Sequence, residues 1–172
     1  TVPVDSSILG KEALQTEPEI RQIFIVGCDD TRELETKLYL IRKSIERKTI
    51  YSIISDKTNC YIASLSTSVM VYKGMLSTMQ LRHYFKDLTN PYFTSAIALV
   101  HSRFSTNTFP TWSLAQPFRM IGHNGEINTI RGNRLWIKAR EAVLKVPEFG
   151  SIAENISPII QPGMSDSASF DN

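Results

Sequence analysis

Between His101 and Asn133 the chain carries two polar stretches, HSRFSTNTFPTW and GHNGEINTIRGN, that a packed core does not require. A third polar stretch, SDSASFDN, contains Asp166. An arginine can bind a carboxylate through paired hydrogen bonds, an aspartate can bind an ammonium group, and fixed N–H donors can stabilise an oxyanion. Together these residue types could recognise a free amino acid and polarise its side-chain carbonyl.

Arg103 is the candidate for binding a carboxylate. Ser102, Ser105 and Thr106 add hydroxyl donors around it, which fits a bound carboxylate. Taken alone, an arginine at the end of a strand is more often a surface or structural residue. The functional interpretation therefore depends on the hydroxyls that surround it.

Asn124 and Gly125 are the candidates for an oxyanion hole. The Asn124 amide and the next backbone N–H can point in the same direction at the end of a strand, as an oxyanion requires. An Asn-Gly pair is more often only a turn. Asp166 is the candidate for an ammonium group, although an aspartate between serines more often caps a helix. Spacing alone leaves both interpretations open.

Helices are expected in three places. Residues 31–48 predict an amphipathic helix with an N-cap among residues 29–31. Its apolar residues follow helical spacing and should face the core: Leu34, Leu38, Ile41 and Ile45. Residues 75–88 and 126–145 also favour helices, the second in spite of Gly132, which costs about 1 kcal/mol relative to alanine.

Short apolar or alternating runs predict strands at residues 21–27, 60–66, 69–73, 95–104 and 118–123. The second and third should form a hairpin that turns at Thr67 and Ser68. Arg103 then lies near the end of one strand, and Asn124 directly follows another. Strands in hairpins with helices between them predict a mixed, largely antiparallel α/β sandwich.

The composition is that of an ordinary soluble protein, with 172 residues, 42% hydrophobic residues and a net charge of +2. This charge gives no reason to expect nucleic acid as a partner. The apolar runs are too short to span a bilayer, and without a signal peptide the expected location is cytoplasmic. Three scattered histidines make a metal site unexpected, and Cys28 and Cys60 form no disulfide framework.

The combination of motifs HSRFST, GHNGEINTI and SDSA resembles the class II glutamine amidotransferase domain of glutamate synthases, in order and in wording. STNTFP, LAQP, RGN and KARE resemble glutamate synthases more than the phosphoribosyl-amine, glucosamine or asparagine branches of that family. The resemblance is clearest from about residue 71 onward. It implies an N-terminal-nucleophile hydrolase fold, a four-layer αββα sandwich with largely antiparallel sheets. Residues 1–172 would be part of a single such domain, and incomplete.

The resemblance also implies a role for each candidate residue. Arg103, assisted by Thr106, would bind the carboxylate of L-glutamine, and Asp166 would bind its ammonium group. Asn124 and Gly125 would form the oxyanion hole during hydrolysis to glutamate and ammonia. The synthase domain of the same polypeptide, with FMN and an iron–sulfur cluster, would transfer the ammonia to 2-oxoglutarate. An electron-donating subunit or ferredoxin would complete the enzyme, and no cofactor is expected in this domain.

The nucleophile of this family is an N-terminal cysteine, whereas residue 1 here is a threonine. Thr1 stands in a Val-Pro context that matches a segment downstream of the family's cysteine. We therefore expect an internal piece of a longer polypeptide that is inactive alone. Two alternatives stay open: another N-terminal-nucleophile amidotransferase, or a non-catalytic module that senses glutamine.

Overall fold

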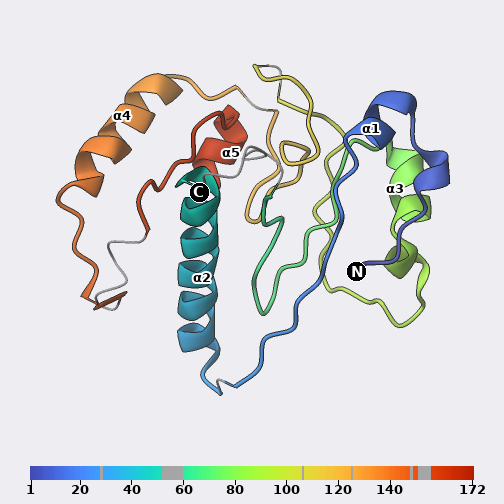
Figure 1. Ribbon diagram of the computed structural model, residues 1–172, viewed down its shortest axis with the longest axis horizontal. Helices are drawn as coiled ribbons and strands as arrows, with labels where there is room; N and C mark the ends of the chain where they lie inside the picture. Colours follow the sequence, from blue (N-terminus) through green and yellow to red (C-terminus); the bar gives the residue numbers. More distant parts are fainter. Residues whose placement is uncertain (28, 52–59, 106, 125, 148, 151–155) are drawn as a thin grey trace.

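The computed structural model describes residues 1–27, 29–51, 60–105, 107–124, 126–147, 149–150 and 156–172. In chain order its elements are η1 (Ser6–Ile8), α1 (Lys11–Gln15), α2 (Thr31–Tyr51), α3 (Thr78–Tyr84), η2 (Lys86–Thr89), α4 (Ile130–Glu141) and α5 (Asp166–Phe170), where η marks a 3-10 helix. Figure 1 shows α2 near the centre, with α1 and α3 to its right and α4 to its left. None of the helices in the described ranges is long and apolar enough to cross a membrane.

The helix α2 confirms the most regular pattern of the sequence. Its first turn is capped by Asp30, whose carboxylate accepts hydrogen bonds from the backbone N–H groups of Arg32 (2.8 Å) and Glu33 (3.0 Å). These bonds satisfy donors that have no partner inside the helix. The helix continues to Tyr51, three residues beyond the expected end.

The buried face of α2 differs from the expected apolar stripe. Its buried side chains are Leu38, Arg42, Lys43 and Glu46. Ile41 and Ile45, which we expected in the core, are each 38% exposed. Glu46 accepts from Arg42 at 2.9 Å and from Lys43 at 3.0 Å. Burial of these charges is tolerated because each cation lies against the same carboxylate.

The helix expected at 75–88 is divided into α3 and η2. Ser77 and Gln80 form a capping box at the start of α3, in which each side chain bonds the backbone N–H of the other residue. Such reciprocal bonds fix the N-terminus of a short helix. Phe85 lies between the two helices in an extended conformation and makes an isolated antiparallel bridge with Val4.

The first hydrophobic cluster joins the N-terminal segment to this region. Its buried residues are Val2, Ala13, Tyr84, Phe85 and Trp112. The indole N–H of Trp112 donates to the Ala13 carbonyl at 3.1 Å. A Cβ on Gly74 would lie 2.3 Å from the Trp112 ring, so only glycine lets the chain pass this close.

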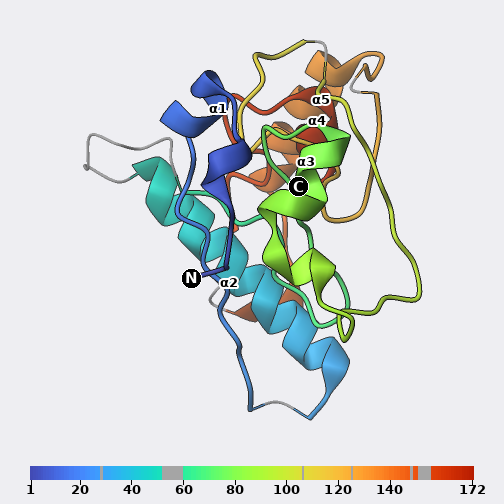
Figure 2. The same ribbon diagram turned by 90° about the vertical axis from the view of Figure 1, so that its right-hand side faces the viewer.

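A second, smaller cluster consists of Leu114, Phe118 and Ala168, with Ile121 and Met164 packed against it. It joins the loop between residues 111 and 121 to α5. The helix α5 also contacts α4, since Arg134 of α4 donates to Ser169 of α5 at 3.0 Å. Figure 2 shows α4 and α5 in the same part of the molecule. The second cluster and this contact form the base on which the candidate site is built.

The expected strands are wrong in the part of the chain that the structure describes. Residues 21–27 and 95–104 form no ladder there, and the first run is exposed, with Phe24 at 81% and Val26 at 91%. The described residues 60–66, 69–73 and 118–123 form no ladder either. Alternation reports which side chains share a face, but a strand also needs a partner backbone, which local patterning does not specify.

The expected reversal at Thr67 and Ser68 is present without a ladder. Side chains replace the backbone bonds: the Ser64 hydroxyl accepts from the Val71 N–H at 3.1 Å. Glu35 of α2 accepts hydrogen bonds from Ser66 and from Thr67. The turn at residues 64–69, which we call the 64–69 tip, is therefore attached to α2 through Glu35.

The helix expected at 126–145 is confirmed over its middle, as α4, and it includes Gly132. Thr129 precedes it with a φ of 58°, a left-handed conformation that is unusual for a β-branched residue. Of the expected α/β sandwich, the helices are thus found among the described residues and the sheets are not.

Candidate functional site

A buried glutamine fixes the chain directly before Asn124. Gln116 is 5% exposed, and its carbonyl oxygen accepts from the His123 N–H at 2.8 Å. Its side-chain N–H donates to the His123 carbonyl oxygen. Between Gln116 and His123 the chain forms a turn, in which the Phe118 N–H donates to the Ile121 carbonyl oxygen at 2.9 Å. Both backbone groups of His123 are therefore held by one side chain.

Asp166 fixes the chain on the other side of Asn124. It is buried in the first turn of α5, and its Oδ2 accepts from the backbone N–H of Ile127 at 3.0 Å. Its Oδ1 lies 3.6 Å from Nη2 of Arg134. Arg134 is oriented in turn by a 2.8 Å bond to the Met164 carbonyl. The two contacts hold the Asp166 carboxyl group in a fixed direction.

We call the segment from His123 to Ile127 the Asn124 loop. Its first residue is bound by Gln116 and its last by Asp166, two side chains far apart in the sequence. Asn124 itself is exposed. The loop therefore presents an accessible carboxamide from a backbone that is attached to the protein at both ends.

Arg103 lies in a segment next to the Asn124 loop. A Cβ on Gly122 would lie 3.5 Å from the His101 ring, so the chain around His101 passes beside the residues that lead to Asn124. The His101 ring accepts from the Arg103 N–H at 3.1 Å through Nδ1. The Arg103 side chain is exposed and can reach a ligand from solvent.

The structure thus brings three predicted site residues, Arg103, Asn124 and Asp166, into neighbouring segments. Thr106 and Gly125 lie outside the described residues. Sequence reasoning did not assign a role to Gln116 or Arg134. Gln116 could have been noticed, because it is a single carboxamide among Leu114, Ala115, Pro117 and Phe118, where burial is expected.

Of the residues that could act as a nucleophile, the structure describes Cys60 and Thr1. Cys60 is exposed and is not in a disulfide. Thr1 is exposed and precedes Val2, which belongs to the first hydrophobic cluster rather than to the second, on which the site is built. Cys28 lies outside the described residues. Within the described ranges no group of three or more His, Cys, Asp or Glu side chains is arranged to hold a metal ion.

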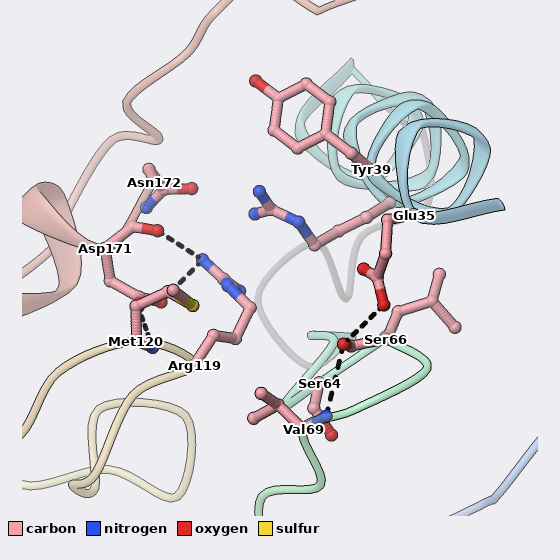
Figure 3. A pocket seen from close by; sticks show the side chains of 11 residues that line it. Glu35, Tyr39, Ser64, Ser66, Val69, Arg119, Met120, Asp171 and Asn172 are labelled. Carbon is pink, nitrogen blue, oxygen red and sulfur yellow. Dashed lines mark hydrogen bonds and ion pairs between the residues drawn. The ribbon is translucent and has the colours of Figure 1, made fainter. Parts of the chain in front are cut away.

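A cleft of about 280 Å³ lies beside α2 and is shown in Figure 3. Arg119 extends across it and pairs with Asp171 at 2.9 Å. Burial, and then the neighbouring Arg42, lower the pKa of Arg119. The walls come from α2, the 64–69 tip and the C-terminal residues rather than from Arg103, Asn124 or Asp166. Its cations Arg119 and Arg42 pair with Asp171 and Glu46.

A larger cleft of about 1250 Å³ contains Lys73 in its wall. The Lys73 ammonium donates to the Ser113 carbonyl at 2.7 Å and lies 4.3 Å from the centre of the Phe118 ring. Burial, with a smaller contribution from Arg119, lowers the pKa of Lys73 to about 7. Through these contacts with Ser113 and Phe118, Lys73 stabilises the loop that contains Gln116.

Comparison with known proteins agrees with these motifs. The family model of class II glutamine amidotransferases matches residues 1–172. The chain is 47% identical over 175 residues to glutamate synthase (NADH) of Schizosaccharomyces pombe, and 46% identical over 173 residues to the glutamate synthase (NADPH) large chain of Azospirillum brasilense. It is 44% identical over 174 residues to the chloroplastic ferredoxin-dependent glutamate synthase of Oryza sativa subsp. japonica.

These alignments cover 99–100% of the chain but only 8–11% of each relative. The chain therefore spans about a tenth of the length of the curated relatives it matches. The similarity concerns the amidotransferase part of much longer proteins.

Proposed function

The chain belongs to the class II glutamine amidotransferases, in the form found in glutamate synthases, and on this premise we propose that it forms the glutamine site of a glutamate synthase. In the full-length polypeptide this domain hydrolyses L-glutamine to glutamate and ammonia. The observation that carries the proposal is the Asn124 loop, which offers a carboxamide donor on a backbone bound by Gln116 and Asp166.

Each candidate residue has a role in this proposal. Arg103, with Thr106, binds the α-carboxylate, and Asp166 attracts the α-ammonium. Asn124 and the Gly125 N–H donate to the oxyanion that forms when the amide carbonyl is attacked. Because these donors are oriented before the substrate binds, little reorganisation opposes the reaction. The complete domain adopts the four-layer αββα sandwich of the family.

The attacking group is an N-terminal cysteine that is not among these residues, so the 172-residue chain does not hydrolyse glutamine by itself. The released ammonia is used by a synthase domain acting on 2-oxoglutarate, which would hold FMN and an iron–sulfur cluster. A ferredoxin or a nicotinamide-dependent subunit would supply electrons. The three donors in the relatives' names, NADH, NADPH and ferredoxin, make either kind of partner compatible with this domain.

Covalent labelling with a diazo-ketone analogue of glutamine tests this proposal by intact mass. The full-length protein should gain one adduct, on an N-terminal cysteine, and lose glutaminase activity in parallel. The 172-residue chain, with a mass of 19.5 kDa, should gain none. An adduct on Cys28 or Cys60 of that chain, or glutamate release by it above a buffer blank, would contradict the proposed division of roles. A full-length protein that binds glutamine without hydrolysis would favour a sensing module instead.

A further inference from the structure

Gln116 is a buried carboxamide whose two polar atoms both serve one residue. Its oxygen accepts from the His123 N–H at 2.8 Å, and its nitrogen donates to the carbonyl oxygen of the same residue. A carboxamide offers a donor and an acceptor on one rigid plane, so it can pair with a backbone as a neighbouring strand would. Neither a carboxylate nor an aliphatic side chain can make both bonds.

The position of this pair along the chain gives it a consequence for the site. His123 is the residue before Asn124, so fixing its N–H and its carbonyl oxygen fixes the peptide plane from which Asn124 starts. At the other end of the Asn124 loop, Asp166 binds the Ile127 N–H. The position of the Asn124 carboxamide therefore depends on a side chain that itself has no access to the substrate.

The surroundings make Gln116 a rigid support. It is 5% exposed, and its neighbours Leu114 and Phe118 are buried in the second hydrophobic cluster together with Ala168 of α5. A buried amide whose hydrogen bonds were lost would keep the penalty of desolvation, so the paired geometry is strongly favoured. The packing that holds Gln116 is the same packing that holds the helix of Asp166.

From this geometry we infer that Gln116 is a positioning residue for oxyanion stabilisation, which it serves by setting the direction of Asn124. The inference rests on the proposed function, because it assumes that Asn124 donates to the oxyanion. Gln116 touches neither substrate nor nucleophile. Its effect is on the transition state, where donor placement matters, and little on the binding of glutamine in the ground state.

The test compares Gln116→Leu with Gln80→Leu in the full-length protein. Gln80 is a matched control, because its carboxamide also bonds two backbone groups, the Ser77 N–H at 2.9 Å and the Ile8 carbonyl at 2.5 Å, but at the start of α3. Gln116→Leu should lower kcat for glutamine hydrolysis at least 10-fold and change KM less than 3-fold. Gln80→Leu should lower thermal stability without changing kcat. Equal kcat values for the two variants at a temperature where both are folded would overturn the inference.

A double-mutant cycle with Asn124→Ala keeps the inference falsifiable if Gln116→Leu is unstable. Gln116→Glu, which retains the acceptor for the His123 N–H and has a similar volume, provides the second variant. If Gln116 acts through Asn124, either substitution should lower kcat much less in the Asn124→Ala background than in the wild type. Equal fold-losses in both backgrounds would show that Gln116 acts independently of Asn124, and would refute the inference.

The same cycle separates the failure of this inference from the failure of the proposed function. If Asn124→Ala leaves kcat unchanged, the proposed oxyanion role is wrong, and the inference falls with it. If Asn124→Ala lowers kcat on the order of 100-fold while Gln116→Leu and Gln116→Glu do not lower it, only the positioning role of Gln116 is wrong.

Discussion

The two sides of the proposed glutamine site are built differently. On one side the Asn124 loop is bound at its ends by Gln116 and Asp166, which are both buried. On the other side Arg103 is exposed, and its backbone N–H donates to the ring of His101, two residues away. The difference fits the tasks: an oxyanion donor must be aimed before the reaction, whereas a flexible cation can move to a carboxylate as it arrives.

The same contrast predicts which substitutions change the stability of the protein and which change only its binding of ligand. A substitution on the bound side changes both the fold and the site, because each of its side chains packs and bonds within the protein. A substitution of Arg103 should change ligand binding alone. Variants on the two sides should therefore differ in whether they change stability or ligand binding.

Among substitutions that act on glutamine binding, the largest effect is expected for Asp166→Asn in the full-length protein. Asparagine retains an oxygen for the Ile127 N–H but loses the negative charge that attracts the ammonium group of glutamine. We expect KM for glutamine to rise about 30-fold, close to the value of a charge-assisted hydrogen bond, with a smaller change in kcat. Steady-state glutamate release measures both constants.

Asp5→Asn is the matched control for this substitution. Asp5 also accepts from a backbone N–H, that of Ser7 at 3.2 Å, and it also pairs with a cation, Lys86 at 2.8 Å. It should leave KM unchanged. If Asp166→Asn lowers stability but likewise leaves KM unchanged, Asp166 supports the loop and does not bind the substrate.

A smaller effect is expected for Arg103→Lys. Lysine keeps the charge but loses the bidentate geometry, so KM for glutamine should rise about 10-fold. Because the side chain is exposed, the melting temperature should stay within about 1 °C of the wild type. Arg82→Lys, at an exposed position in α3, should change neither quantity. A fall in melting temperature with an unchanged KM would mean that Arg103 is structural, and that the two sides do not differ as we describe.

The smallest effect concerns stability against pH on the bound side. The pKa of Lys73 is lowered to about 7 by burial in the folded chain and returns to its ordinary value near 10.5 on unfolding. Between these values the unfolded chain binds more protons, so the free energy of unfolding should rise with pH, by about 1 kcal/mol from pH 7 to pH 8. Urea denaturation of the chain and of Lys73→Met measures this. If the free energy of unfolding depends on pH equally in the two proteins, the burial of the Lys73 amine is contradicted.

The sequence predicted the helices better than the rest of the fold. The cap at Asp30 and the 3.6-residue period of α2 are local signals, and they located its start correctly. The buried face was wrong in part, because the ion pairs of Glu46 with Arg42 and Lys43 allowed charges to replace the apolar stripe. The strands failed because pairing is a long-range property, and residues such as Phe24 stay exposed among the described residues.

For the site, the sequence motifs predicted Arg103, Asn124 and Asp166, and the structure places the three in neighbouring segments. The support around them could not be predicted in the same way. The bond between Asp166 and Ile127 and that between Arg134 and Met164 depend on how α4 and α5 meet in space. Such contacts have no spacing rule in the sequence, although an isolated carboxamide in an apolar run, as at Gln116, is a signal worth following.

The central claim is that the Asn124 loop and Arg103 form a single glutamine site, and a crystal structure of the full-length protein with bound L-glutamate tests it most directly. We predict the α-carboxylate on the Arg103 guanidinium, the α-ammonium within hydrogen-bond distance of Asp166, and the side-chain carboxylate facing the Asn124 amide. Glutamate bound instead in the cleft beside Arg119, with Arg103 and Asn124 both free, would contradict the account.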